Sequence, residues 1–397
     1  MENNMKYLLL MIVAIIFSCS IPKKEEVAEE LTVSSPAGDN SEEATFFTTQ
    51  DGIIGLSWLE KKDKIAALKF SVLKNSDWTE PQTLVSGKDI LTNWADFPGI
   101  QTNGDYWVAW FLQMNNPDTF AYDVMVMQSS DAGKSWSSPQ RLHSDSTLTE
   151  HGFVSVVKAE NGFQLMWLDG RLATEESPIF TVRSAHLNRE GVISNRTILD
   201  DNTCTCCQTT MLNTGNDNFI AMYRNRTEEE IRDIATVNYT NTGSQGQPQI
   251  IHADEWYIPG CPVNGPRSIL NGEELGVAWF TMGTEGVATI KFATSTDKGK
   301  TYSEPIIIDK KNKGRVDVIA LNGAYYLSYL DDVEGGTEVK IVQIKDNQIK
   351  ETYSVTNVSA SRKTGFPRMA LSKNGNGIYV SYTDVETKKV AIEFLKL

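Results

Sequence analysis

A repeat with a period of 50 to 57 residues limits the fold of this sequence more than any other feature. An apolar segment with an aromatic residue near its centre recurs along the chain, preceded by small or turn-forming residues and followed by a polar one. Its copies are centred on Trp58, Trp110, Trp167, Tyr223, Trp279, Tyr329 and Tyr382. Such a period indicates that one supersecondary unit is built several times and packed against its neighbours.

Each copy is the second of four short segments that have the pattern of β-strands. In the unit at 151–200 they read "HGFVSVVKA", "FQLMWL", "FTVRSAHL" and "VISNRTIL", separated by turn residues such as Asn161 and Gly162. Helical periodicity is nearly absent after residue 45. Repeated four-stranded antiparallel units are the blades of a β-propeller. The sequence therefore predicts an all-β propeller over residues 45–397, with seven blades favoured and six as the alternative.

The last repeat ends at Leu397, after its third strand. A blade without its outer strand has an open edge that invites pairing with other chains. Residues 31–35, "LTVSS", have strand character and are candidates to fill that place and close the ring.

The N-terminus has the pattern of an export signal. Lys6 precedes an apolar run, Tyr7 to Ser18, whose length fits a signal peptide, and Cys19 follows it. "IFSC" resembles the lipobox of bacterial lipoproteins, which implies cleavage before Cys19 and lipid attachment to its sulfur; an ordinary signal peptide or an N-terminal membrane anchor is the alternative. We expect a signal peptide at 1–18, a polar tether at 19–44, and a protein held by its lipid at the outer membrane or surface of a bacterial cell envelope.

Two segments indicate which propellers this one is similar to. "SSDAGKSW" (Ser129–Trp136) and "STDKGKTY" (Ser295–Tyr302) each place an Asp, a Gly and an aromatic residue at the same spacing after a third strand. The Asp accepts backbone N–H groups in the turn, and the Gly permits positive φ. They resemble the Asp-box of the sialidase and BNR-repeat superfamily. That resemblance covers residues 45–397.

The resemblance implies a sialidase-like propeller and, beyond the fold, glycan chemistry. The corresponding function is an exo-sialidase-like glycoside hydrolase acting on an anionic sugar, and the alternative is a lipoprotein that binds a glycan or a protein without catalysis. The first repeat, "ATFFTTQDGIIGLSW", lacks the arginine that sialidases carry there, and their Tyr–Glu pair has no match in the sequence. The formal net charge of −14 disfavours nucleic acid as a partner.

Most of the unusual polar residues fall in loops that share one face of a propeller. Those loops lead into first strands or connect second strands to third strands. Guanidinium groups suit bidentate recognition of an anionic ligand, and the residues predicted to bind the sugar are Arg171, Arg224, Arg226, Arg232, Asn264, Arg315 and Arg368. The competing interpretation is that such arginines form ion pairs within the fold, as Arg224 and Arg232 would with Asp169, Asp233 or Glu230.

Three residues in the same loops are candidates for proton transfer. His151 opens the third repeat and has an ordinary pKa near neutrality, while Asp169 and Asp233 follow or precede strands on the same face. We predict these three as the catalytic residues, and the alternative is that each only stabilises its loop.

Three cysteines lie within four positions of one loop, Cys204, Cys206 and Cys207, and Cys261 follows in the next repeat on the same face. Thiols of an exported protein tend to pair or to bind metal. Three interpretations stay open: a disulfide from Cys261 to the cluster, a zinc or copper site with His151 as a further ligand, or a catalytic thiol.

Overall fold

The computed structural model describes residues 26–27, 33–117, 119–174, 178–241, 243–244 and 246–397. The predicted signal peptide and Cys19 lie outside the described residues. Within those residues, no helix combines the length and the apolar character that a membrane span requires.

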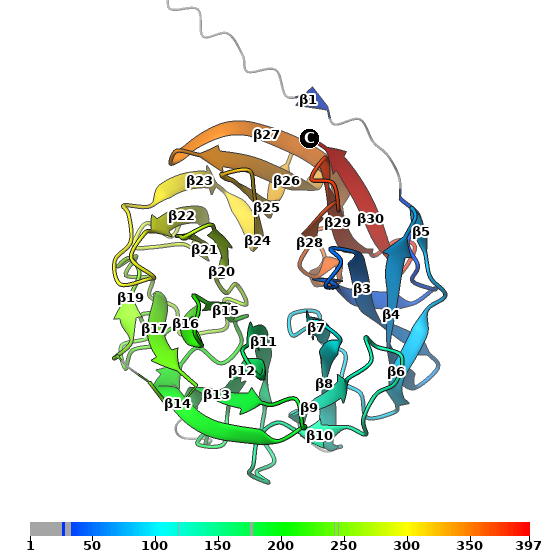
Figure 1. Cartoon of the computed structure of the whole chain (residues 1–397). Coiled ribbons are helices and arrows are strands. Elements are labelled where there is room, and N and C mark those ends of the chain that lie inside the picture. The colour runs from blue at the N-terminus through cyan, green and yellow to red at the C-terminus, as the bar shows by residue number, and fades with distance from the viewer. Residues whose placement is uncertain (1–25, 28–32, 118, 175–177, 242, 245) are drawn as a thin grey trace, which may run out of the picture.

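The chain forms a ring of seven antiparallel blades around a central axis (Figure 1), so the favoured prediction is confirmed. In each blade the first strand lies innermost. Blade 1 contains β2 (Ser41–Thr48), β3 (Ile54–Lys62), β4 (Ile65–Lys74), β5 (Asp77–Trp78) and β6 (Gln82–Gly87), and blade 2 contains β7 (Gly99–Asn103), β8 (Tyr106–Asn116), β9 (Ala121–Ser129) and β10 (Gln140–Arg141). Blade 3 contains β11 (His151–Ala159), β12 (Gly162–Asp169), β13 (Phe180–Leu187) and β14 (Ile193–Thr203). Blade 4 contains β15 (Thr210–Asn213), β16 (Asn218–Arg224), β17 (Ile234–Thr240), β18 (Gly243–Ser244) and β19 (Gln249–Ile250).

The remaining blades complete the ring. Blade 5 contains β20 (Arg267–Asn271), β21 (Glu274–Thr281), β22 (Thr289–Ser295) and β23 (Ile306–Lys310), and blade 6 contains β24 (Asn312–Leu321), β25 (Ala324–Val333), β26 (Gly336–Lys345) and β27 (Gln348–Val358). Blade 7 contains β28 (Arg368–Leu371), β29 (Gly377–Asp384) and β30 (Lys389–Lys396), and the short 3₁₀ helix η1 (Arg362–Thr364) precedes it.

The repeated aromatic residues form the core between blades. Trp58, Trp167 and Trp279 are fully buried on the second strands of blades 1, 3 and 5. The fully buried Trp167 packs with Trp110 in one cluster that joins blade 2 to blade 3. The repeat found in the sequence is therefore the set of side chains that hold neighbouring sheets together.

The ring closes by side-chain packing rather than by a shared strand. Blade 7 has three strands, and the described part of the predicted closing segment, 33–35, forms no strand. Val33 instead packs against a cluster that joins blade 1 to blade 7, and the Val390 N–H donates to Ser41 Oγ (2.9 Å). The two-residue strand β1 (Glu26–Val27) pairs in parallel with β27 at the outer edge of blade 6. Of the described residues before blade 1, Glu26 and Val27 pair with the sixth sheet, and none forms a fourth strand on the seventh.

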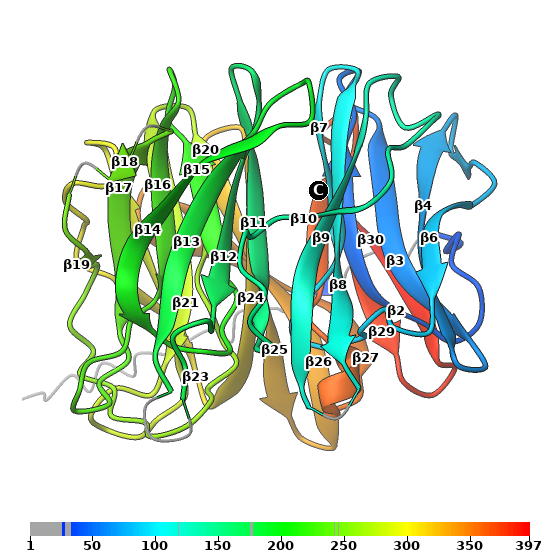
Figure 2. The same cartoon turned by 90° about the horizontal axis from the view of Figure 1, so that it is seen from below.

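The two Asp-boxes have the expected turn geometry. Asp131 Oδ1 and Asp297 Oδ1 each accept the backbone N–H four residues later (2.9 Å in both), and Gly133 and Gly299 have φ of 80° and 75°. Both turns join third strands to fourth strands. They lie on what we call the turn face, which carries the short turns at the top of Figure 2. The opposite face, here called the loop face, carries the loops that lead into first strands and those between second and third strands.

Candidate functional site

The loop face is where the strand order brings the predicted residues. Arg224 ends β16, Arg171 follows β12, and the cysteine loop joins β14 to β15. Because every blade is antiparallel and starts at the same side, these positions lie on the lower side of the ring in Figure 2. Contacts between blades support this placement, since Arg232 Nη1 lies 3.4 Å from Cys204 Sγ. Sharing a face does not yet make these residues one site, because each has its own partners.

Loops from distant blades meet at the centre of the loop face. The Trp94 ring, before blade 2, stacks on Phe366, before blade 7, with ring centres 5.9 Å apart. Gln208 Nε2, before blade 4, donates to the Ala95 carbonyl (2.6 Å). Blade 2 is adjacent neither to blade 7 nor to blade 4, so these contacts reach across the axis of the ring. The middle of this face is therefore covered by packed loops.

A cavity of about 330 Å³ follows the first strands along the axis. Its wall is mostly apolar or hydroxylated, with contributions from six of the seven blades. Its charged lining residues are Asp96, Arg267 and Arg368. A cavity of this size, mostly apolar with a few charged groups, has the character of a small-ligand site.

Two of the arginines predicted to bind sugar are held by backbone carbonyls. Arg224 is 1% exposed and donates to the carbonyls of Asn264 (3.0 and 2.7 Å), Arg232 (2.6 Å) and Phe280 (2.6 Å). Arg315 donates to two carbonyls of the segment before blade 7, at 361 and 365 (3.2 and 2.9 Å). Both guanidinium groups fasten loops of different blades to one another.

Other predicted arginines are paired with carboxylates. Arg226 and Arg232 each donate to Glu230 (2.6 Å for both Nη2 atoms), and Arg171 makes a bidentate pair with Asp169 (2.7 and 2.6 Å). Glu230 is therefore the partner of Arg232, as the ion-pair interpretation required.

Arg368 and Asn264 complete the predicted binding set. Arg368 is buried 3.8 Å from Asp317, and its Nη1 has no hydrogen-bond partner among the described residues. Burial, with the nearby Arg267 charge, lowers the pKa of Arg368 to about 9. Asn264 Oδ1 accepts the Arg315 N–H (2.7 Å). Of the predicted set, only Arg368 combines a place on the cavity wall with an unused donor.

The predicted catalytic residues lie in two places. His151 is fully buried, stacked on His143 (3.7 Å between ring centres), and its Nε2 lies 3.2 Å from Asp145 Oδ2 and 3.8 Å from Asp169 Oδ2. Burial and the neighbouring His143 lower the pKa of His151. Burial raises the pKa of Asp169, but the Arg171 hydrogen bonds and the His151 charge outweigh it, so that it stays below its ordinary value.

Asp233 is remote from that pair. It accepts the N–H groups of Glu255 (2.9 Å) and Trp256 (3.1 Å), and burial raises its pKa. It therefore anchors the loop between blades 4 and 5.

A second group of carboxyls, which the sequence analysis did not select, lies at the start of the first strands. Asp96 is 2% exposed; its Oδ1 accepts the Phe153 N–H (2.8 Å), and its Oδ2 lacks a well-formed hydrogen bond among the described residues. Burial, with repulsion from Glu150, raises the pKa of Asp96 to about 7. Glu150 also has a pKa raised to about 7, by burial and then by Cys261.

Tyr122 connects these two carboxyls. Its hydroxyl donates to Glu150 Oε2 (3.4 Å) and lies beside Asp96, where it counteracts the rise in the pKa of that carboxyl. Glu150 precedes His151 in the sequence, so a signal for it existed, but nothing in the pattern distinguished Asp96 or Tyr122 from ordinary turn and strand residues.

Exposed apolar side chains lie in several loops of the loop face, and one of them, Phe120, contacts Tyr122. Phe120 is 56% exposed and lies edge-on to Tyr122 (5.4 Å between ring centres), and Tyr257 is 64% exposed in the loop between blades 4 and 5. Leu148 and Leu172 are exposed in the neighbouring loops. Exposed aromatic residues beside convergent polar groups are typical of ligand sites.

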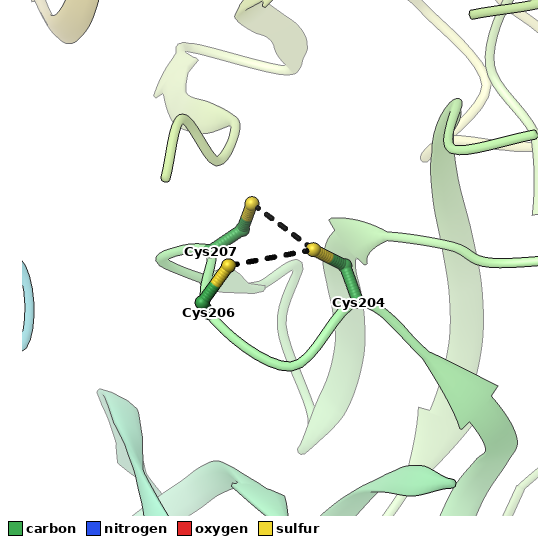
Figure 3. A group of neighbouring side chains, drawn as sticks. All are labelled: Cys204, Cys206 and Cys207. Carbon is green, nitrogen blue, oxygen red and sulfur yellow. Dashed lines mark hydrogen bonds between the residues drawn. The ribbon is translucent and has the colours of Figure 1, made fainter. Parts of the chain in front are cut away.

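The cysteine loop is compact, and its thiols point toward one another (Figure 3). Cys204 Sγ lies 3.3 Å from Cys207 Sγ and 4.0 Å from Cys206 Sγ, and Cys261 Sγ lies 3.7 Å from Thr205 Oγ1. Among the described residues none of the four cysteines forms a disulfide, so the predicted bond from Cys261 to the cluster is absent. The 3.3 Å between the sulfurs of Cys204 and Cys207 exceeds the ~2.05 Å of a disulfide bond.

Electrostatics differ among the four thiols. Hydrogen bonds from Cys206 and Cys207, with the Arg232 charge, lower the pKa of Cys204. Burial raises the pKa of Cys207 to about 12, and interaction with Cys206 lowers the pKa of Cys261 to about 6. The cluster therefore favours an anionic sulfur at Cys204, beside the guanidinium group.

Comparisons with known proteins agree with the resemblance seen in the sequence. The BNR repeat-like domain family matches residues 60–252. Among solved structures, a protein of unknown function from Dyadobacter fermentans is similar at 13% identity and a TM-score of 0.52, with 95% of this chain and 100% of that chain covered. No curated protein matches the chain.

Two further solved structures are carbohydrate-active enzymes. The GH93 α-L-arabinofuranosidase of Fusarium graminearum, in complex with arabinobiose, is 12% identical with a TM-score of 0.50 and coverage of 94% and 98% of the two chains. An α-L-arabinanase of Penicillium chrysogenum is 9% identical with a TM-score of 0.52 and coverage of 92% and 98%. Identities this low show the fold. The chain is a seven-bladed β-propeller whose residues 60–252 match the BNR repeat-like domain family.

Proposed function

We propose that this protein is an exported glycoside hydrolase, with Asp96 and Glu150 as its catalytic carboxyl pair. The observation that carries the proposal is the presence of two carboxyl groups on either side of one phenol, each with a pKa raised to about 7. Cleavage of a glycosidic bond needs one carboxyl that is protonated and one that is ionised at the same pH.

The pair has the charge state that this chemistry requires. Near neutral pH, two interacting carboxyls with raised pKa values hold about one proton between them. Tyr122 donates to Glu150 and can shift toward Asp96, so either carboxyl can be the one that stays ionised. Asp96 lines the axial cavity, and its Oδ2 has no well-formed hydrogen bond that a substrate hydroxyl would have to displace.

The surroundings favour a neutral sugar over the anionic one suggested by the sequence. Arg171, Arg224, Arg226, Arg232 and Arg315 are all engaged by acceptors of the protein itself. Arg368 is the exception, because its Nη1 lies on the wall of the axial cavity without a hydrogen-bond partner among the described residues, but this atom already lies 3.8 Å from Asp317. Phe120, beside Tyr122, offers apolar surface to a sugar ring. Arabinosides are the first substrates to test, because two similar propellers were solved with arabinobiose.

The test is hydrolysis by purified protein of a panel of aryl glycosides and oligosaccharides that includes arabinosides, sialosides and uronides. Glu150→Gln and Asp96→Asn should each lower kcat by about 10²- to 10⁴-fold, because each removes a proton-transfer group and keeps the shape. Glu160→Gln, at an exposed turn on the opposite face, is the matched control and should leave the rate unchanged. Absence of turnover on the whole panel would refute the hydrolase. Binding to a glycan array without hydrolysis would leave the non-catalytic glycan-binding alternative in its place.

We further propose that Cys19 carries a lipid and holds the protein at the bacterial cell envelope, as the signal-like run before it suggests. Cells grown with a clickable fatty acid should label the wild-type protein and not Cys19→Ala, and only the wild type should sediment with membranes. Equal labelling of the two proteins would contradict the anchor.

A further inference from the structure

The cysteine cluster on the loop face is not one of the proton-transfer groups proposed above, although Cys261 contributes to the raised pKa of Glu150, and it needs its own explanation. We propose that Cys204, Cys206, Cys207 and Cys261 form a thiolate site for one soft d¹⁰ metal ion, Zn²⁺ or Cu⁺. This inference rests on the geometry of the thiols and stands whether or not the protein hydrolyses glycans.

The sulfur positions match those around a single ion. Zinc–thiolate bonds of about 2.3 Å in a tetrahedral site place the sulfurs about 3.8 Å apart. Cys204 Sγ lies 3.3 and 4.0 Å from the other two cluster sulfurs, and the three ligand atoms all lie within 4.8 Å of one another. Both sulfur separations from Cys204 lie within about half an ångström of the spacing around zinc.

The backbone provides the tight loop that such a site requires. In an extended chain, Cys207 would point away from Cys204 and Cys206. Here β14 ends at Thr203, whose Oγ1 donates to the Arg224 carbonyl (2.8 Å), and the chain bends at Thr205 and Cys206. Cys204 N–H donates to the same carbonyl (3.0 Å). The bend turns the third thiol back toward the first, and it is fixed to the neighbouring strand before any metal arrives.

Cys261 is the candidate for the fourth ligand, although its sulfur is not one of the three that lie within 4.8 Å of one another. It comes from the loop before blade 5, and its thiol interacts with Cys206 and with Thr205 Oγ1 (3.7 Å). It is exposed, whereas Cys204 and Cys207 are buried. An exposed fourth ligand beside three clustered ones gives an ion a route into the site.

The charges around the cluster fit a thiolate–metal centre. Three or four thiolates with Zn²⁺ have a net charge of −1 or −2, and a buried anion of this kind needs compensation. Arg232 Nη1 lies 3.4 Å from Cys204 Sγ, and its Nε and Nη2 are fixed on Glu230 (3.0 and 2.6 Å). The buried Arg224 adds a second positive charge near Cys207. Partners that orient and neutralise the ligands are a regular part of metal sites.

The two ions can be told apart by their coordination. Zn²⁺ in a structural site takes four ligands, so it depends on Cys261. Cu⁺ is satisfied by two or three thiolates, and the buried trio would hold it without the exposed cysteine.

The experiment titrates full-length protein, purified without oxygen or chelator, with Zn²⁺ and separately with Cu⁺ against a chromophoric competing chelator. We expect one ion to bind per chain. With Co²⁺ as a probe ion, the absorption spectrum should show a thiolate-to-metal charge-transfer band. Cys204→Ser and Cys207→Ser should lose both ions, Cys261→Ser should lose tight Zn²⁺ binding and keep Cu⁺, and Thr205→Ser is the matched control within the loop.

A second pair of variants tests the charge argument. Arg232→Gln should weaken binding about 10- to 100-fold, because it removes the guanidinium group that contacts the sulfur. Arg226→Gln breaks the other ion pair of Glu230, does not reach the thiols, and should leave affinity unchanged.

Failure of the reduced wild-type protein to bind either ion at a ratio near one would overturn the proposal, and this result does not depend on how well any variant folds. If all four cysteines are oxidised in protein isolated from the cell envelope, and the protein still binds no metal after mild reduction, the cluster forms two disulfides instead. Hydrolysis at Asp96 and Glu150 is measured separately on the glycoside panel, so failure of the metal proposal and failure of the hydrolase proposal are distinguishable.

Discussion

Replacing Asp96 by Asn should make the protein more stable at alkaline pH and change it little in acid. Asp96 is 2% exposed, and its pKa is raised from an ordinary 3.8 to about 7, chiefly by burial. A raised carboxyl pKa means that the folded state holds the proton more tightly than the unfolded state. Its stabilising contribution is therefore fully present below about pH 4 and is lost as pH rises to about 7.

The magnitude follows from the size of the pKa shift. A rise of about three pH units, at about 1.4 kcal/mol per unit, corresponds to about 4 kcal/mol of unfolding free energy lost by the wild type above pH 7. Asn resembles the protonated acid and can still accept the Phe153 N–H, so Asp96→Asn escapes this loss. Because Asp96 is almost wholly buried, solvent screening reduces the effect little.

The assay is urea unfolding of wild type, Asp96→Asn and the exposed control Glu160→Gln from about pH 4 to about pH 8.5. The advantage of Asp96→Asn over wild type should grow from near zero in acid to a few kcal/mol at the alkaline end, while the control stays parallel to wild type. Glu150 and Glu43 lie close enough to influence Asp96, and they remain in both proteins. A difference between Asp96→Asn and wild type that does not change with pH would refute the view that this carboxyl is held protonated by burial.

Three further outcomes follow from other contacts. Arg224→Met should destabilise the fold by about 2–5 kcal/mol in urea unfolding, because three carbonyls of blades 4 and 5 lose their donor, and an unchanged midpoint would show that water replaces the guanidinium group. Asp297→Ala should lower the Tm measured by calorimetry. Because hydrogen bonds from Thr301 hold the pKa of Asp297 at about 2, the difference in Tm between the variant and the wild type should vanish only as the pH falls toward that value. Removing Zn²⁺ or Cu⁺ from the cysteine site by dialysis against chelator should lower Tm, and adding the ion back at a hundredfold excess over Kd should restore about 2.7 kcal/mol, whereas Cys204→Ser should show no response.

The fold could be read from the sequence because the repeated aromatic residues do the same task in each blade. Trp58, Trp167 and Trp279 are buried at equivalent positions between sheets, so their spacing is a direct record of blade length. The Asp-boxes were equally readable, since all the hydrogen bonds of Asp131 and Asp297 lie within a few residues of the turn. The way in which the ring closes could not be predicted from the sequence. Whether the N-terminal segment pairs with blade 6 or with blade 7 depends on contacts between the two ends of the chain.

The location of the candidate site was predicted better than its members. Strand order alone placed the cysteine loop and the arginines on one face, since that requires only counting strands. The carboxyl pair was not predicted from the sequence, because the raised pKa values of Asp96 and Glu150 are due mainly to burial. Burial depends on how the loops pack and cannot be recognised from the residue type or its neighbours in the sequence. Tyr122 matters only because Glu150 comes from the next blade to meet it.

The arginines of the loop face show why residue type is a weak guide to ligands in a propeller. Loops that cross the axis bury carbonyl groups far from any strand partner, and each buried carbonyl needs a donor. A guanidinium group supplies five donors from one side chain, which is how Arg224 serves three residues and Arg315 two. Arginine is therefore expected wherever such loops are packed, with or without a ligand. A buried carboxylate can serve a structural purpose, as Asp233 does for the N–H groups of Glu255 and Trp256, but a buried carboxyl that accepts few bonds loses the solvation of its charge without replacement. Among the buried polar groups of the described residues that lack a hydrogen-bond partner, Asp96 Oδ2 and Arg368 Nη1 belong to residues that line the axial cavity, and that is where a bound sugar would find partners.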